Sequence, residues 1–262
     1  MAFEVTAEAY DRFMGRFSTP LARLFVPEAR IVPGMRVLDV GSGPGALTGA
    51  LVETVGADHV TAADPMPGFV ASLQERHPGV TAHVAAAEAL PLDDGGVDAA
   101  LAALVVPFMA DPVAGLREMA RVTRAGGVVA ATVWQHASGT SPLSPFWDGV
   151  SDVDPDADNE SIAPGIREGH LAELFGEAGL PGSTTTVLTV TVEFERFQDW
   201  WEPFTYGVGP AGAFVAAQPP ERVAAVRAAC AARLGPEPFS VAGSAWCTVA
   251  GVPARRVPKT GL

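Results

Sequence analysis

Two aspartates and a glycine-rich turn stand in the first quarter of this 262-residue chain, each at the end of an apolar segment. Asp39 closes the first apolar segment, and the turn Gly41-Ser42-Gly43-Pro44-Gly45 follows almost directly. Glycines at such a turn let the backbone approach a ligand closely. Asp64 ends the next apolar segment, where a carboxylate can accept hydrogen bonds from a ribose diol. The pattern indicates a site for a nucleoside-containing cofactor.

The glycines alone do not choose between cofactors. Residues 41–46 also satisfy the dinucleotide fingerprint, with alanine at its third position. Asp39 favours a cofactor with a cationic amino-acid end, because a carboxylate at the end of an apolar strand needs a polar partner and would repel a pyrophosphate. Helix capping or turn formation is the alternative role for both aspartates. An NAD-dependent oxidoreductase is a weaker hypothesis, since Lys259 is the only lysine and a Tyr-x-x-x-Lys pair is impossible.

Short apolar runs alternate with helical patterns from residue 36 to 134, which is typical of a parallel sheet covered on both faces. We therefore expect one domain over residues 1–262, an α/β Rossmann-like doubly wound fold with a mainly parallel seven-stranded sheet. Residues 31–136 form the cofactor-binding core. Strands are expected at 36–40, 59–64, 81–85, 97–104, 127–133, 184–193 and 239–251, and helices at 46–55, 67–76, 112–123 and 169–178.

Three segments outside this core are expected to cover the cofactor or the substrate. Residues 1–30 predict two short cap helices, because Gly15 and Pro20 interrupt an amphipathic pattern. Residues 137–168 are rich in Ser, Pro, Gly and Asp and predict a lid loop. Residues 195–238 predict a helical cap insertion before the last strand.

Composition narrows the class of partner. The formal charge of −13 argues against nucleic acid, whose binding needs clustered basic residues. No apolar run reaches the roughly 18 residues of a membrane span, and the first residues lack a signal-peptide pattern, so we expect a cytoplasmic protein with no membrane partner. Cys230 and Cys247 lack the spacing of metal ligands, so no metal is expected. The sequence leaves the oligomeric state open.

Four ordered segments resemble the class I S-adenosylmethionine (SAM)-dependent methyltransferases, especially the ubiquinone/menaquinone-biosynthesis, or type 11, group. The resemblance runs from about residue 8 to 134. The segments are Val37–Gly45, Asp64-Pro65-Met66, Ala87–Leu92 with Val97-Asp98, and Leu116–Val122 with Gly126-Gly127. Four motifs in order and at family spacing are far more specific than one glycine turn.

The resemblance implies that SAM is the cofactor and assigns residues to its parts. Its methionine end lies beside the buried aspartate and the glycine turn, its ribose on the second aspartate, and its adenine against the residues that follow. Tyr10 closes over the cofactor. The expected cofactor-binding residues are Tyr10, Asp39, Gly41, Ser42, Gly43, Asp64, Pro65, Met66, Ala87, Glu88 and Leu104.

Two departures from the family pattern bear on the cofactor. Ala86 stands where many relatives have an aspartate that binds the adenine amine, and Ala102 and Ala103 stand where relatives often have a polar residue. These departures motivate an alternative, a methyltransferase-like protein that binds SAM or S-adenosylhomocysteine (SAH) in a non-methylating role, as a cyclase or regulatory module.

The expected partner is a small-molecule methyl acceptor, hydrophobic or aromatic, methylated on O, N or C. His136 follows the fifth strand and is the candidate general base, the alternative being a loop histidine without a chemical role. Aromatic residues outside the motifs could wall the acceptor pocket or simply pack the inserted helices onto the sheet. The expected substrate-binding residues are Trp134, Phe146, Trp147, Trp201 and Tyr206.

Overall fold

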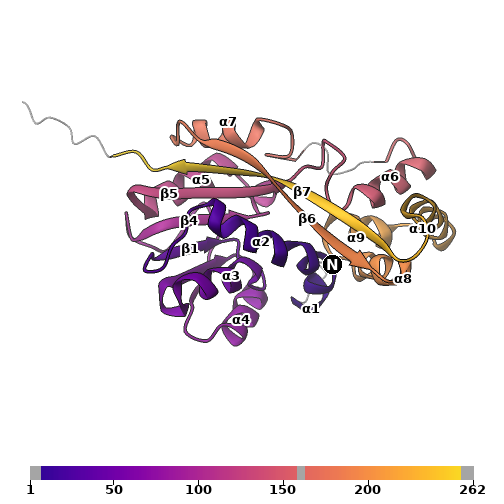
Figure 1. Ribbon diagram of the computed structural model, residues 1–262, viewed down its shortest axis with the longest axis horizontal. Helices are drawn as coiled ribbons and strands as arrows, with labels where there is room; N and C mark the ends of the chain where they lie inside the picture. Colours follow the sequence, from indigo (N-terminus) through magenta and orange to yellow (C-terminus); the bar gives the residue numbers. More distant parts are fainter. Residues whose placement is uncertain (1–6, 158–162, 255–262) are drawn as a thin grey trace, which may run out of the picture.

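A seven-stranded sheet forms the centre of the computed structural model, which describes residues 7–157 and 163–254 (Figure 1). The strand order is β3-β2-β1-β4-β5-β7-β6, and only β7 runs antiparallel to its neighbours. This confirms the expected Rossmann-like sheet. The strands are β1 (Val37–Val40), β2 (Val60–Asp64), β3 (Thr81–Val84), β4 (Val97–Ala103), β5 (Thr123–Trp134), β6 (Thr184–Phe194) and β7 (Phe239–Gly251).

Helices cover both faces of the sheet because its central strands are apolar on both sides; every residue of β1 is buried. One face packs against α2 (Arg16–Glu28), α3 (Ala46–Val55) and α4 (Pro67–Arg76). The other face packs against α5 (Pro112–Val122) and α7 (His170–Glu177). The predicted positions of α3, α4, α5 and α7 are confirmed to within a residue at each end.

The strand β5 begins earlier than expected. Thr123 to Gly126 were expected to end the preceding helix and form a turn, but α5 stops at Val122 and β5 starts at once. Thr123 pairs with Val97 of β4, and its hydroxyl donates to the carbonyl of Met119 at 2.8 Å. Pairing with β4 therefore ends the helix at Val122 and makes Thr123 the first residue of β5.

A second group of helices gathers at one end of the sheet, around the ends of β6 and β7 (Figure 1). β6 pairs with β7 along its whole length, whereas β5 pairs only with residues 245–251 of β7. A group of helices, which we call the cap, lies around the part of the β6–β7 hairpin that does not pair with β5. The cap consists of α6 (Ser144–Val153), α8 (Phe197–Trp201), η5 (Glu202–Tyr206), α9 (Gly209–Ala217) and α10 (Pro220–Leu234).

The cap has its own aromatic core. Phe146 is fully buried and stacks on Phe204 with ring centroids 4.5 Å apart. Trp200 and Trp201 pack on the same phenylalanine, at 4.8 and 6.0 Å. Edge-on and offset contacts of this kind stabilise beyond the area that they bury.

Two predictions about the covering segments are wrong. Residues 137–168 were expected to be loop, but α6 lies within them because Phe146 and Val150 bury one face of a short helix. Residues 158–162 of that segment lie outside the described residues. The N-terminal segment does not split at Gly15 and Pro20. α1 (Ala7–Tyr10), a π-helical turn (η1, Asp11–Gly15) and α2 run on continuously, since burial of one face outweighs the hydrogen bond lost at Pro20.

No helix in residues 7–157 and 163–254 is long and apolar enough to cross a bilayer.

Candidate active site

The glycine turn joins β1 to α3 at the carboxyl edge of the sheet. Gly41, Gly43 and Gly45 all have positive φ, at 67°, 53° and 103°. A Cβ on Gly41 would lie 2.3 Å from Cγ2 of Val105, which follows β4. The backbone N–H of Gly41 donates to the carbonyl of Ala63 on β2, at 2.8 Å. Gly41 is therefore required both by its backbone conformation and by the close approach of the next strand.

Asp64 holds this turn against β2. Its Oδ2 accepts from the N–H of Gly43 and its Oδ1 from the N–H of Met66, both at 2.8 Å. The side chain is buried, and this burial raises its pKa while the two backbone hydrogen bonds oppose the rise. Each carboxylate oxygen has a second lone pair, so a ribose diol can bind without displacing either backbone donor.

Asp39 lies under the turn and is fully buried. Its Oδ2 accepts from the hydroxyl of Thr48 at 2.6 Å, while its Oδ1 has no partner among the described residues. Burial raises the pKa of Asp39 to about 7, and the negative charge of Asp64 adds to the rise. A buried carboxylate with an unpaired oxygen fits a cofactor that brings a cationic group to the turn.

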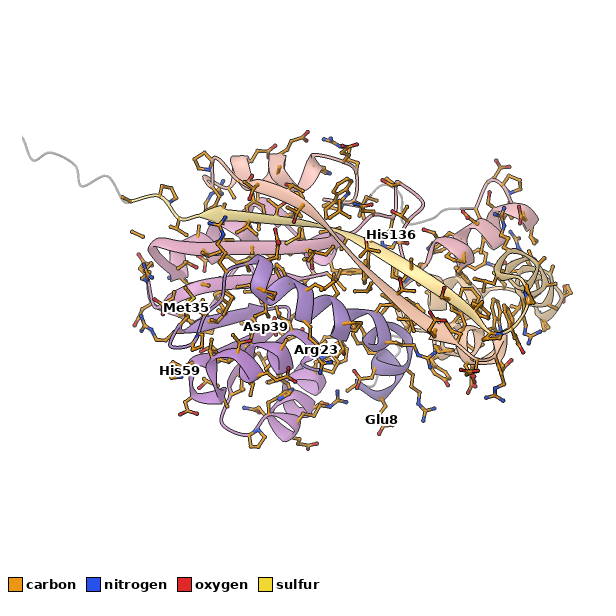
Figure 2. All side chains as sticks on the ribbon, viewed as in Figure 1. Glu8, Arg23, Met35, Asp39, His59 and His136 are labelled. Atoms are coloured by element: carbon orange, nitrogen blue, oxygen red, sulfur yellow. The ribbon has the colours of Figure 1, made fainter. Side chains whose placement is uncertain are left out.

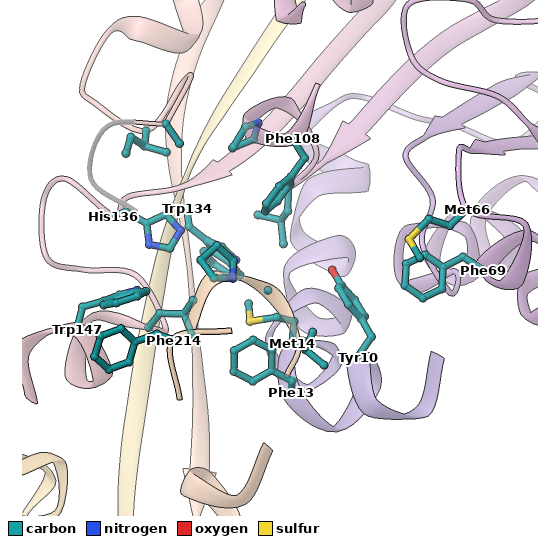
Figure 3. Close-up of a pocket in the computed structure, with 18 residues that line it drawn as sticks. Tyr10, Phe13, Met14, Met66, Phe69, Phe108, Trp134, His136, Trp147 and Phe214 are labelled. Atoms are coloured by element: carbon teal, nitrogen blue, oxygen red, sulfur yellow. The ribbon is translucent and has the colours of Figure 1, made fainter. Parts of the chain in front are cut away.

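A cavity of about 650 Å³ opens beside the turn, within the usual range for small-molecule sites (Figure 3). At one end Met66 and Phe69 flank it, from the start of α4 and its preceding loop. At the other end lie the residues after β5 and the cap. Figure 3 shows Tyr10, Phe13 and Met14 of the N-terminal segment between the two ends. The cavity thus extends from the predicted cofactor site to the predicted acceptor site.

Tyr10 stands at the cofactor end. Its ring meets that of Phe69 edge-on, with centroids 5.9 Å apart. Burial raises the pKa of Tyr10 to about 12, and Asp64 and Asp11 add to the rise. The phenol is therefore a protonated hydrogen-bond donor at neutral pH.

His136 and Trp134 stand at the acceptor end. Burial lowers the pKa of His136 to about 4, so its imidazole is neutral at pH 7. The imidazole makes no hydrogen bond within the described part of the chain. Trp134 is 5% exposed, and its Nε1 likewise has no partner among the described residues. Trp147 and Phe214 complete this end, with ring centroids 5.8 Å apart.

Several predicted site residues do not line the cavity. Phe146 and Trp201 pack in the aromatic core of the cap, which is the alternative role considered from the sequence. Tyr206 donates its hydroxyl to Glu202 at 2.8 Å and also lies outside the cavity wall. These three residues pack within the cap and are not part of the cavity wall.

On the cofactor side, Met66, Leu104 and Tyr10 line the cavity. Leu104 has φ of +65°, uncommon for a residue with a side chain, and its N–H donates to the carbonyl of Thr132 at 2.9 Å. Asp39, Asp64 and the glycine turn are not in the cavity wall, but Leu104 of the wall directly precedes Val105, the residue against which Gly41 lies. Ser42 is buried and Pro65 exposed.

The predicted adenine-edge pair lies away from the cavity wall. Ala87 packs in the core, and Glu88 accepts a hydrogen bond from the N–H of Asp111 at 3.1 Å. Ala102 is fully buried and Ala86 is exposed, and neither they nor Ala103 line the cavity. None of the described wall residues is an aspartate or glutamate that could take the place of the carboxylate expected at residue 86 from the family resemblance.

Sequence reasoning missed part of the wall. Phe13 and Met14 stand three and four residues after Tyr10, so helical spacing could have placed all three on one face. Val208 and Phe214 fall within the predicted helical cap insertion, but neither was predicted to line the cavity. No local signal marks them, because the cap's packing brings them to the cavity.

The glycine turn also has support on its outer side. Arg76 pairs with Asp11 at 2.6 Å and donates to the carbonyl of Pro44 at 3.4 Å. Neighbouring His77 lies against Gly45, and its pKa is lowered chiefly by burial. Arg76, the last residue of α4, therefore ties the N-terminal segment to the turn, a role that was not predicted from the sequence.

Comparison with known proteins identifies the family of the segment that contains the glycine turn. Residues 38–131, which contain the turn and both aspartates, match the methyltransferase domain family. An uncharacterized methyltransferase of Mycobacterium tuberculosis is 41% identical over 131 residues, 48% of this chain and 49% of that protein, so the match spans about half of its length. Aklanonic acid methyltransferase DauC of a Streptomyces species is 30% identical over 150 residues, 55% of this chain and 68% of that protein.

A solved structure shares the fold. A crystal structure titled as that of a methyltransferase from Bacillus halodurans aligns with a TM-score of 0.58 and 17% identity, over 89% of this chain and 99% of that one. The chain belongs to the SAM-dependent methyltransferase family, and its relatives include demethylmenaquinone methyltransferase of Beutenbergia cavernae, 36% identical over 44% of this chain and 45% of that protein.

Proposed function

We propose that this protein transfers a methyl group from SAM to a small hydrophobic or aromatic acceptor held at the cap end of the cavity. The observation that carries the proposal is the buried Asp39 carboxylate, with one unpaired oxygen under a glycine turn, next to a cavity that continues into an aromatic chamber. SAM, when bound, supplies an electrophilic methyl group on a sulfonium.

The residues at the turn would hold the cofactor. Asp39 would attract the cationic amino-acid end, Asp64 would accept from the ribose, and Met66 would pack against the adenine. Tyr10 would close the site from above. Membership of the family supports these roles, since its members share the fold and the ordered motifs.

The cap end would hold the acceptor and exclude water. Methyl transfer chiefly requires that the nucleophile be aligned and kept dry. Trp134 and Trp147 give this end an apolar wall, and His136 would take up the proton that an acidic acceptor group loses, at an imidazole nitrogen. His136 is neutral at pH 7, so one imidazole nitrogen has a free lone pair, but burial makes it a weaker base than an ordinary histidine.

The first experiment is isothermal titration of the full-length protein with SAH, with NAD as the control. Micromolar binding of SAH alone would support the proposed cofactor. Binding of NAD instead, or of neither ligand, would refute it. Asp39→Asn keeps the shape of the side chain but removes its charge, so it should weaken SAH more than Asp58→Asn, a change at an exposed site.

A second assay separates methyl transfer from the non-methylating alternative. SAM labelled in its methyl group is incubated with the protein and a panel of hydroxylated aromatic compounds, and labelled product is extracted. Transfer that depends on His136 supports the proposal. Tight SAH binding with no labelled product on any acceptor would favour the cyclase or regulatory hypothesis, which Ala86, Ala102 and Ala103 motivate.

A further inference from the structure

We propose that the cap end of the cavity selects an uncharged aromatic acceptor that carries a hydroxyl group, and that His136 receives this hydroxyl as its hydrogen-bond partner. The inference rests on the proposed function, because it assigns the acceptor class of the same site. It narrows the proposed class of acceptor from any hydrophobic or aromatic metabolite to neutral aromatic compounds that carry a hydroxyl group.

The charge of the wall carries the first step. The protein has a formal charge of −13, yet none of the described residues that line the cavity is Asp, Glu, Lys or Arg. A carboxylate or ammonium group buried there would lose its hydration without gaining an ionic partner, which is costly. The wall therefore favours a ligand whose buried part is neutral.

The shape of the wall carries the second step. Trp134, Trp147 and Phe214 stand together at the cap end, as Figure 3 shows. Behind them Phe146 contacts both Trp147 and Phe214 edge-on, at 5.1 and 6.1 Å. Rings fixed in this way by a packed core offer rigid faces for another aromatic ring.

The polar group at this end carries the third step. His136 follows β5 at the carboxyl edge of the sheet and makes no side-chain hydrogen bond among the described residues. Its neutral imidazole has one donor nitrogen and one acceptor nitrogen. A hydroxyl group can pair with either nitrogen, whereas a carbonyl can pair only with the donor. Trp134 Nε1, also without a described partner, adds a second donor to this side of the cavity.

Among the described residues, the rest of the wall at the cap end is apolar. The other described wall residues on the cap side are Leu143, Ala163, Ile166, Val208, Gly209 and Pro210, none of which has a polar side chain. A ligand with one hydroxyl on an apolar ring system would match both the wall and its polar point. One relative is named for aklanonic acid, so an organic acid is the competing class.

Three matched probes test the proposal by isothermal titration at pH 7.5, with and without saturating SAH. They are 2-naphthol, which is neutral with a hydroxyl, 2-methoxynaphthalene, which lacks the O–H, and 2-naphthoate, which is an anion. We expect 2-naphthol to bind about three- to tenfold more tightly than the methyl ether, the effect of one net hydrogen bond. We expect it to bind at least about thirtyfold more tightly than 2-naphthoate. Equal or tighter binding of 2-naphthoate would overturn the proposal.

His136 is tested with two variants and a control. His136→Phe should bind 2-naphthol and its methyl ether equally, whereas His136→Gln, which keeps a donor and an acceptor, should retain part of the preference. His59→Phe makes the same change on the opposite side of the molecule and should behave as the wild type (Figure 2). A preference that survives His136→Phe in protein of unchanged melting temperature would contradict the assignment of His136.

These measurements separate the proposal from the cofactor assignment. If SAH fails to bind but 2-naphthol binds through His136, the acceptor class stands and the proposed methyl transfer falls. If SAH binds and the naphthol preference is absent, the acceptor class falls and the methyltransferase assignment stands.

Discussion

The two ends of the cavity are built differently. At the predicted cofactor end, the wall residues Met66 and Leu104 come from the ends of β2 and β4, and behind them lie the glycine turn and two buried carboxylates. The acceptor end is built from aromatic side chains of the cap and the residues after β5, with no charged side chain among the described wall residues. One end is fixed by backbone geometry, and the other by side-chain packing.

This difference predicts how each end tolerates change. At the cofactor end, Gly41 and Asp64 hold backbone atoms of two strands within hydrogen-bond distance, so small changes propagate to the ligand site. At the acceptor end, Trp147 and Phe214 belong to a cap whose rings can be exchanged for others of similar volume. Cofactor use should therefore be sensitive to substitution, whereas acceptor choice should be adjustable.

The largest effect is expected for Gly41→Ala. Its Cβ would collide with Val105 at 2.3 Å, and its φ is positive. We expect a loss of about 3 kcal/mol in the free energy of unfolding, together with loss of SAH binding. Gly43→Ala is the matched control, since its φ is also positive but no atom lies within 4 Å of the new Cβ. It should cost about 1 kcal/mol. Urea denaturation compares the two, and equal losses would show that the contact with Val105 does not matter.

Asp64→Ala comes next. It removes the acceptor for Gly43 and Met66 as well as the expected ribose contact. Hydrogen bonds to a charged group contribute about 1.5–3 kcal/mol, so the Kd for SAH should rise about 10- to 100-fold. Asp58→Ala, on an exposed turn before β2, should leave the Kd unchanged. An unchanged Kd in Asp64→Ala would refute its place in the cofactor site.

The two ends should respond to pH with opposite signs. The pKa of Asp39 is about 7 in the folded protein against 3.8 for a free side chain, so its contribution to stability is present below pH 3.8 and is lost as pH rises towards 7. The pKa of His136 is about 4 against 6.5, so its contribution is present above pH 6.5 and is lost as pH falls towards 4.

Two variants separate these contributions to stability. The measurement is the urea concentration at which half of the protein is unfolded, at each pH from 4 to 8. Relative to the wild type, Asp39→Asn should gain stability as pH rises, and His136→Phe should gain it as pH falls. Parallel curves for wild type and Asp39→Asn would mean that Asp39 is already ionised in the fold at pH 4. SAH affinity sharpens the comparison, because ionised Asp39 would attract the ammonium group of SAH. The wild-type Kd should fall between pH 6 and 8, and that of Asp39→Asn should stay nearly flat.

Sequence alone predicted the sheet well, together with the places of the glycine turn and both aspartates at its edge, for a physical reason. Asp39 contacts Thr48, nine residues later, and Asp64 contacts the turn and Met66, so motif and spacing largely determine these contacts. Phe146 and Trp201 were misplaced because an aromatic residue in a cap can face a cavity or its own core, and only the packing decides. Phe214 was missed for the same reason. It lies in α9, in the connection between β6 and β7, and only the packing of the cap brings it to the cavity.

The smallest effect is expected where the N-terminal segment is tied to the cofactor end. Arg76 pairs with Asp11 at 2.6 Å, but both side chains are more than a third exposed, so water and salt screen the pair. Arg76→Met keeps the apolar stem and should lower the free energy of unfolding by about 0.5 kcal/mol. It should nevertheless weaken SAH binding about twofold to threefold, because Tyr10, next to Asp11, then closes over the cofactor less often. Arg23→Met, at an ion pair with Glu53 that is about two-thirds exposed, is the control. If both variants bind SAH equally, the N-terminal segment is held by burial of Phe13 and Phe17 rather than by Arg76, and the cofactor end depends on side-chain packing as the acceptor end does.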